Sequence, residues 1–147
     1  MYTYRFSKIL DIQEQEKIQI EIIYKESVKS FEEVATKLYE MLKKKEDLIA
    51  YQNERLTFGA SIDEVTHYAS FINSLEKTIE DLQKKVAQAR VKMNWHEEKL
   101  LEKNIEVRKY EKMREKDFEA FQVEQERSEN IRLDELSTMA YYKKEIR

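Results

Sequence analysis

The chain has 147 residues, of which 39% are charged and 41% hydrophobic, and it contains one glycine and no proline or cysteine. Its formal net charge of −3 provides no strongly basic face for nucleic acid, and the lack of cysteine excludes disulfides and thiolate metal sites. Compact domains of this length normally place several glycines and prolines at their turns, so the composition favours long solvated helices. No apolar run approaches the roughly 20 residues of a membrane span, and Met1–Ser7 lacks the apolar stretch of a secretory signal, so we expect an intracellular protein.

A coiled-coil pattern predicts a first helix over about residues 4–57. Alternating steps of four and three residues from Phe6 give fifteen seam positions, of which nine are apolar. The average period of 3.5 residues is that of a helix whose apolar stripe faces one partner helix. The positions are Phe6, Leu10, Gln13, Lys17, Ile20, Tyr24, Ser27, Phe31, Val34, Leu38, Met41, Lys45, Leu48, Gln52 and Arg55.

The strongest break in this pattern predicts a turn over residues 58–61. Gly59 can adopt the left-handed conformation that ends a helix. Ser61 followed three residues later by Glu64 has the spacing of a capping box, and Asp63 and Glu64 suit the positive end of a helix dipole. A second helix is therefore expected to begin near residue 62.

The second helix is predicted over about residues 62–143, with seventeen seam positions of which thirteen are apolar. Pairing residues whose numbers sum to 120 joins an a position to a d position in every layer, as an antiparallel coiled coil requires. We therefore predict one all-α domain over residues 1–147, a long antiparallel two-helix coiled-coil hairpin. The positions are Val65, Tyr68, Ile72, Leu75, Ile79, Leu82, Val86, Ala89, Met93, His96, Leu100, Lys103, Val107, Tyr110, Arg114, Asp117 and Phe121.

The seam becomes polar toward the two termini. The pairing places Lys17 opposite Lys103, which would be costly in a dry seam, so we expect this part of the hairpin to be looser and wetter. From about residue 118 the second helix has no partner in the chain. The unpaired overhang carries a short apolar stripe of Leu133, Leu136, Met139, Ala140 and Tyr142.

The sequence offers no catalytic, metal or cofactor site. His67 and His96 lie far apart without any cysteine, which is not a metal-binding spacing. Acidic pairs such as Glu97-Glu98 lack the concave, partly dry pocket that catalytic carboxylates need. One glycine cannot form a phosphate-binding loop, so we do not expect an enzyme.

Aromatic residues gather around the predicted turn. Tyr68 fills a seam position, whereas Tyr51 and Phe71 fall just outside the seam. Aromatic side chains beside a seam are typical anchors for a partner protein, but they can also simply widen the core. Either role fits the pattern.

Several short strings resemble the family of the flagellar export protein FliJ, in the form found in Bacillus-type bacteria. The most specific is the run from His67 to Glu80, which contains Tyr-x-x-Phe-Ile-x-x-Leu-Glu-Lys-x-Ile-Glu after the turn. The N-terminal Tyr4–Leu10, the pre-turn Tyr51–Glu54, the later Arg108–Met113 and the Leu133–Leu136 string add to it. The resemblance spans essentially the whole chain.

This resemblance implies a coiled-coil hairpin similar to the central shaft of rotary ATP synthases. It implies a non-enzymatic stalk of the flagellar type III export apparatus, whose termini sit in the pore of the hexameric export ATPase ring and promote its assembly and activity. It also implies contact with the cytoplasmic domain of the export-gate membrane protein and an escort role for export chaperones. The expected location is cytoplasmic, at the inner side of the cell membrane through the apparatus.

The resemblance assigns two partner surfaces. Two positions at the edges of the gate surface depart from the family's pattern: Arg55, where some members have an aromatic residue, and Thr78, where some have alanine. The gate surface maps onto Leu48, Tyr51, Phe71, Leu75 and Leu82. The candidates for the ATPase ring are Phe6, Ile9, Phe121, Leu133 and Leu136.

A generic coiled-coil adaptor or scaffold is the alternative. A hairpin that pairs its own two seams is expected to be a monomer, whereas a scaffold of extended helices would dimerise through the same seams. Light scattering distinguishes the two.

Overall fold

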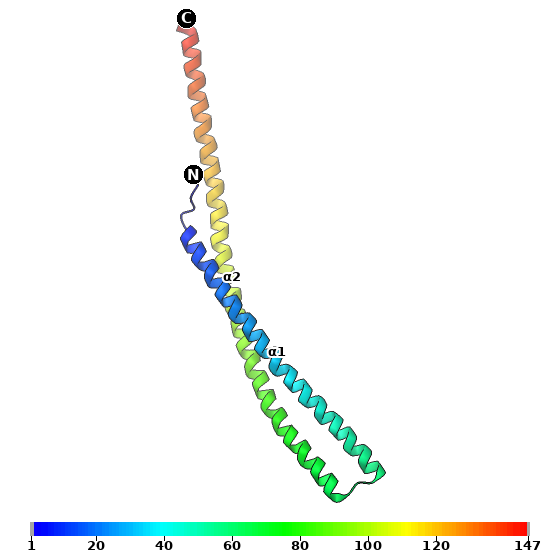
Figure 1. Cartoon of the computed structure of the whole chain (residues 1–147). Coiled ribbons are helices and arrows are strands. Elements are labelled where there is room, and N and C mark those ends of the chain that lie inside the picture. The colour runs from blue at the N-terminus through cyan, green and yellow to red at the C-terminus, as the bar shows by residue number, and fades with distance from the viewer. Residues whose placement is uncertain (1, 147) are drawn as a thin grey trace. The chain divides into compact units, whose positions relative to one another are not determined.

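The chain folds into two long helices that pack antiparallel as a hairpin (Figure 1). A computed structural model describes residues 2–146, with helix α1 at Ser7–Phe58 and helix α2 at Ile62–Ile146. The all-α hairpin predicted from periodicity is confirmed. Helix α1 begins at Ser7 rather than near residue 4, because residues 2–6 form a non-helical segment whose side chains pack against α2.

Contacts divide the chain into two units, which are described separately. Unit 1 contains the residues up to Lys17 and those from Glu102 onward, and unit 2 runs from Ile18 to Leu101. Unit 2 therefore includes the turn, and unit 1 includes the N-terminal segment and the last part of α2.

Burial follows the predicted seam closely. All fifteen seam positions of the first series are buried or half-buried, and in the second series Arg114 and Asp117 are the exposed exceptions. In unit 2 the most buried apolar side chains are Leu75 and Ile79. A two-helix contact covers only one stripe of each helix, so few side chains are removed fully from water.

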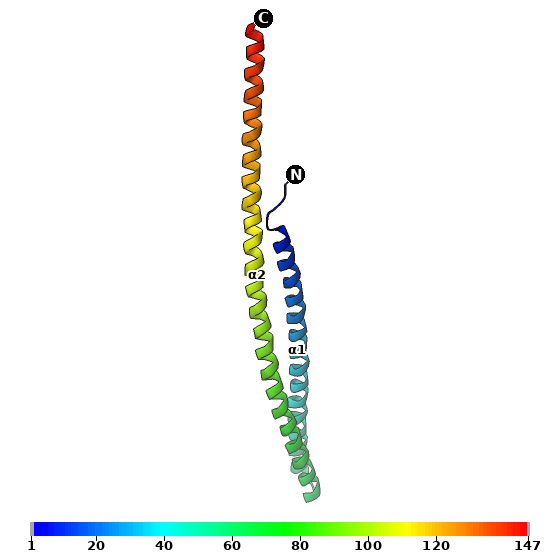
Figure 2. The ribbon, with the colours of Figure 1, turned by 90° about the vertical axis from the view of Figure 1, so that its left-hand side faces the viewer.

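Contacts between the two helices of unit 2 hold the predicted register. The Arg55 guanidinium lies 3.1 Å from the Glu64 carboxylate, and the Tyr51 and Tyr68 ring centroids lie 5.5 Å apart. Further from the turn, the Lys45 ammonium lies 3.4 Å from the Glu76 carboxylate. Each pair is within one residue of the predicted pairing, and the two helices of this unit lie side by side in both views (Figures 1 and 2).

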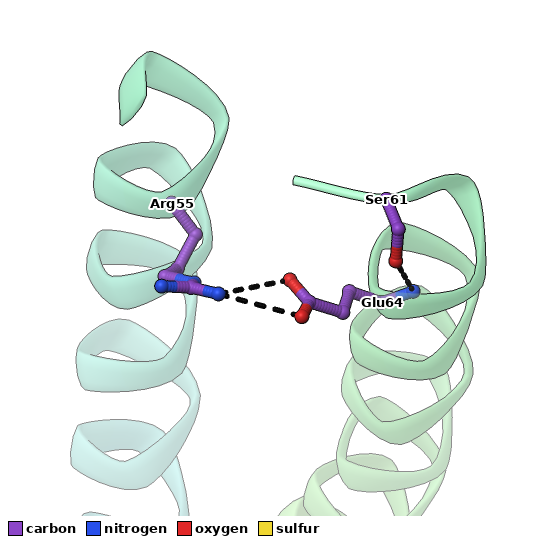
Figure 3. Close-up of polar contacts among 3 residues, drawn as sticks. All are labelled: Arg55, Ser61 and Glu64. Atoms are coloured by element: carbon purple, nitrogen blue, oxygen red, sulfur yellow. Dashed lines mark hydrogen bonds and ion pairs between the residues drawn. The ribbon is translucent and has the colours of Figure 1, made fainter. Parts of the chain in front are cut away.

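Two local features form the turn. Gly59 has a φ of 91°, a left-handed value that non-glycine residues seldom adopt. The Glu64 amide donates a hydrogen bond to Ser61 Oγ at 3.2 Å, which confirms Ser61 as the N-cap of α2. The reciprocal half of the capping box is absent, because the Glu64 carboxylate instead accepts two hydrogen bonds from Arg55 (Figure 3).

Unit 1 contains a tightly packed apolar cluster and a compensated Lys103, in a part of the hairpin that was expected to be loose and wet. Leu10 is only 1% exposed and Val107 2%, and both contact the buried Tyr4. The Lys103 ammonium is paired with the Glu16 carboxylate and lies 3.8 Å from that of Glu106, so its charge is compensated. The seam positions alone leave out the acidic residues that lie beside Lys103, so they overstate its charge cost, and hydrogen exchange still has to test the expected looseness.

Candidate functional site

The side chains around the turn form the first candidate surface, on unit 2. Tyr51 and Phe71 are both exposed, at 47% and 42%. The Tyr51 ring stands edge-on to Tyr68, and the Lys44 ammonium lies 5.7 Å from the centre of the Phe71 ring. These two aromatic rings are therefore held in place by neighbours yet remain accessible, which is the condition for a contact residue.

The leucines assigned to the same surface lie differently. Leu75 is 7% exposed and belongs to the core of unit 2, so in the free chain its side chain packs between the helices. Leu48 and Leu82 are half-buried seam residues. Within the predicted set, Tyr51 and Phe71 are thus the outward-facing members, and Leu48, Leu75 and Leu82 pack between the helices.

Polar contacts at the turn fix the edges of this surface. The Glu64 carboxylate raises the pKa of Arg55, first through its hydrogen bonds and then through its charge, so Arg55 stays cationic at any ordinary pH. A side-chain hydrogen bond with Tyr51 and partial burial raise the pKa of Tyr68, so its phenol stays neutral near pH 7. The surface therefore presents aromatic rings beside the cationic groups Lys44 and Arg55.

A segment that we call the N-terminal strap, residues 2–6, lies along α2 in unit 1. The Tyr4 hydroxyl donates to the Tyr110 carbonyl at 3.2 Å, and the Tyr2 hydroxyl donates to Asp117 Oδ2 at 2.9 Å. The Tyr2 ring also meets Phe118 and Phe121, with centroids 5.0 and 5.1 Å away. The strap thus occupies the α2 seam beyond the start of α1.

Sequence reasoning missed the strap. The alternation Tyr2, Tyr4, Phe6 is a period of two, which is typical of an extended segment with one apolar face, and it was the available signal. Burial raises the pKa of both tyrosines above the ordinary phenol value of 10.0, and the Asp117 carboxylate adds to the rise. Both hydroxyls therefore remain protonated donors at neutral pH.

The strap contacts two of the residues predicted to face the ATPase ring. Phe121 packs against Tyr2 and Phe6 packs against Tyr4, so both are half-buried inside unit 1. The overhang consequently begins after Phe121 and not near residue 118. Ile9, by contrast, is 40% exposed.

The overhang of α2, residues 122–146, forms the second candidate surface. Every side chain described from Gln122 to Glu145 is exposed, and no other part of the described chain lies beside this stretch (Figure 2). Leu133 and Leu136 are among the large apolar side chains left open to solvent. The others in this stretch are Val123, Ile131, Met139, Tyr141 and Tyr142. An exposed apolar stripe of this kind is typical of a helix that pairs with another protein.

Other chemistry-bearing residues form no site. Within residues 2–146 there is no cluster of three or more side chains suited to a metal ion, and no helix is long and apolar enough to cross a membrane. His96 is half-buried in the seam and stacks edge-on against Trp95, whereas His67 is exposed beside Tyr68. Each histidine thus lies beside an aromatic ring and not in a cluster of metal-binding side chains.

Known proteins similar to this chain match it over nearly its full length. The family model described as Flagellar FliJ protein matches residues 1–145. The chain is 45% identical over 136 residues to the Flagellar FliJ protein of Bacillus subtilis (strain 168), with 92% of each chain covered. The fold is similar to that of CT670 from Chlamydia trachomatis, described as a YscO homolog, with a TM-score of 0.67, 19% identity and 96% of each chain covered.

The structural likeness concerns the fold alone, whereas the family model and the B. subtilis relative concern the sequence of almost the entire chain. The chain therefore belongs to the flagellar FliJ family and is a non-catalytic component of flagellar protein export.

Proposed function

We propose that this chain is a stalk of the flagellar type III export apparatus, which inserts into the export ATPase ring and links it to the export gate. The observation that carries the proposal is the overhang, whose apolar side chains from Val123 to Tyr142 are exposed and pack against no other part of the described chain. An unpaired amphipathic helix of this length would fray in water, so a partner is required to hold it.

The ATPase-facing surface in this proposal comprises the overhang stripe and the exposed Ile9. Leu133 and Leu136 lie three residues apart and thus share one helix face. The chain itself performs no chemistry, so stimulation of ATP hydrolysis would arise because the bound stalk favours the assembled or active state of the ring.

The experiment is a phosphate-release assay with the cognate export ATPase and the full-length chain. A double variant, Leu133→Glu with Leu136→Glu, should abolish stimulation while circular dichroism shows an unchanged helix content. The control is Val91→Glu, because Val91 is also an exposed apolar residue of α2 but lies outside the overhang. Stimulation by the double variant at the wild-type level would contradict the proposal.

The gate-facing surface in this proposal is the exposed aromatic pair Tyr51 and Phe71, supported from within by Leu48, Leu75 and Leu82. Calorimetric titration against the isolated cytoplasmic domain of the export-gate protein tests it. Phe71→Ala should weaken binding with little change in melting, whereas Leu75→Ala should lower the melting temperature because Leu75 is buried. A large loss of stability with unaltered binding for Phe71→Ala would show that Phe71 serves packing alone.

The same proposal includes an escort role for export chaperones and a peripheral location at the cytoplasmic membrane through these partners. We further propose that the free chain is a monomer, because each helix pairs its seam with the other helix of the same chain. Light scattering should give the mass of one chain, and a dimer would instead favour the scaffold alternative.

A further inference from the structure

Three large aliphatic side chains form a row along α1 within unit 2. Leu42, Ile49 and Leu56 follow one another at intervals of seven residues, and their exposed fractions are 42%, 37% and 50%. An interval of seven residues is close to two helical turns, so the three side chains share one face of α1. We call this row the apolar flank.

The apolar flank adds a third apolar position to each heptad of α1. Every member directly follows a seam position, and the same heptad place upstream holds the half-buried Ala35 and Val28. A helix that pairs with one neighbour needs two apolar positions per heptad, whereas a helix in a bundle of three or more uses three. Within the described chain α2 is the one helix packed against α1 in this unit, so no second helix covers the part of the third position that α2 leaves exposed.

Contacts across the seam show that the apolar flank lies on the opposite side of the helix pair from the exposed aromatic residues Tyr51 and Phe71. Lys44 lies over Phe71, so these two residues and Tyr51, which shares the heptad place of Lys44, lie on one side of the seam. On the other side, Glu76 reaches Lys45 at 3.4 Å. Glu76 occupies in α2 the heptad place that the apolar flank occupies in α1, and in antiparallel pairs these places border the same side.

The border of the apolar flank is predominantly acidic. Glu46, Glu76 and Glu80 lie there, and the Lys45 ammonium, 3.4 Å from the Glu76 carboxylate, compensates one of these three charges, so Glu46 and Glu80 carry the remaining negative charge. A partner that covers the flank would therefore gain from positive charge beside its own apolar stripe. The bordering residues are Tyr39, Glu46 and Asn53 in α1 and Thr66, Ala69, Asn73, Glu76, Glu80 and Gln83 in α2.

We propose that the apolar flank binds an amphipathic helix of another protein, whose apolar stripe is bordered by lysine or arginine, as a third helix against α1 and α2. This contact is separate from the ATPase-facing and gate-facing surfaces of the proposed stalk function and does not depend on them. Leucine-sized side chains on the partner would cover Leu42, Ile49 and Leu56, and its cationic groups would lie beside the three glutamates.

The test uses a synthetic three-heptad peptide with leucine at the a and d positions and lysine at the e and g positions. Its lysines repel one another, which keeps the free peptide monomeric at low concentration. Fluorescence anisotropy with the labelled peptide and the full-length chain should show saturable binding. Ile49→Glu should weaken that binding about tenfold or more, because a carboxylate would enter an apolar contact.

Two controls make the result specific. Val91→Glu places the same charge at an exposed residue of α2 outside the flank and should bind the peptide as the wild type does. A peptide with glutamate in place of lysine should bind about tenfold more weakly or worse, since it would face like charges. Ile49 is partly exposed, so melting curves should show that its variant still folds, and Leu56→Ser provides a milder second variant.

The proposal is overturned if the lysine peptide does not bind the wild-type chain, or if Ile49→Glu and the wild type bind it equally. Equal binding of the lysine and glutamate peptides would overturn the chemistry assigned to the partner. Light scattering supplies the remaining outcome: a wild-type dimer that Ile49→Glu converts to monomer would show that a second copy of this chain covers the flank, which also contradicts the proposal.

Discussion

Among the residues of unit 1, Leu10 is expected to cause the largest loss of folding stability when its side chain is truncated. It is 1% exposed and lies in a cluster with Tyr4 and Val107, against which Tyr2, Phe6 and Tyr110 pack. Leucine-to-alanine changes in protein cores cost about 2–5 kcal/mol. A cluster of one strap and two helices can close part of the cavity by small movements, so Leu10→Ala should lower the free energy of unfolding by about 2–3 kcal/mol.

The matched control is Ile12→Ala, two residues further along the same helix. Ile12 is 53% exposed, so its truncation loses little burial, and alanine is the better helix former. Its effect should stay within about 0.5 kcal/mol. Urea denaturation followed by circular dichroism gives both values, and hydrogen exchange of amides near residues 10 and 107 locates the change.

The reasoning about unit 1 is refuted if the two variants have equal stability. Faster exchange near residues 10 and 107 in the wild-type chain than in the middle of unit 2 would also refute it, because buried side chains and compensated charges in unit 1 predict protected amides there. That outcome would instead support the expectation that the seam is loose near the opposed Lys17 and Lys103.

Further changes test the turn and the strap. Gly59→Ala should destabilise the hairpin by about 1 kcal/mol in thermal melts, because residues with a side chain rarely adopt its φ of 91°. No atom lies within 4 Å of an added Cβ, so this cost is backbone strain alone, and Gly59→Asn should recover part of the loss. Ser61→Ala should cost about 1 kcal/mol through the lost N-cap, with an unaltered midpoint counting against the cap. Because the pKa of Tyr2 and of Tyr4 is raised in the folded chain, their contribution to folding stability is complete below pH 10.0. It is lost as the pH rises through their higher pKa in the folded state. Tyr2→Phe combined with Tyr4→Phe should remove that part of the alkaline fall in melting temperature, and an unchanged pH profile would show that the phenols do not hold the strap.

The helices, the seam and the turn were determined by the sequence alone. Periodicity identifies a helix face without knowledge of what covers it, and a helix stop at Gly59 followed by a cap at Ser61 depends only on neighbouring residues. One turn position then aligned the two seams, because helix geometry is regular over the whole distance.

Only the tertiary structure decided which side chains lie free and which are paired. The Tyr2 and Tyr4 contacts join the first residues of the chain to Tyr110 and Asp117 far along it, and no local pattern encodes such a pairing. These contacts bury Phe121 and move the start of the overhang. The Glu64 carboxylate likewise had two possible donors, the Ser61 amide at the start of its own helix and the Arg55 guanidinium in the other helix. It accepts from Arg55, because the two helices lie close together at the turn. Local regularity thus determined the hairpin, whereas long-range side-chain contacts determined the surfaces that it presents.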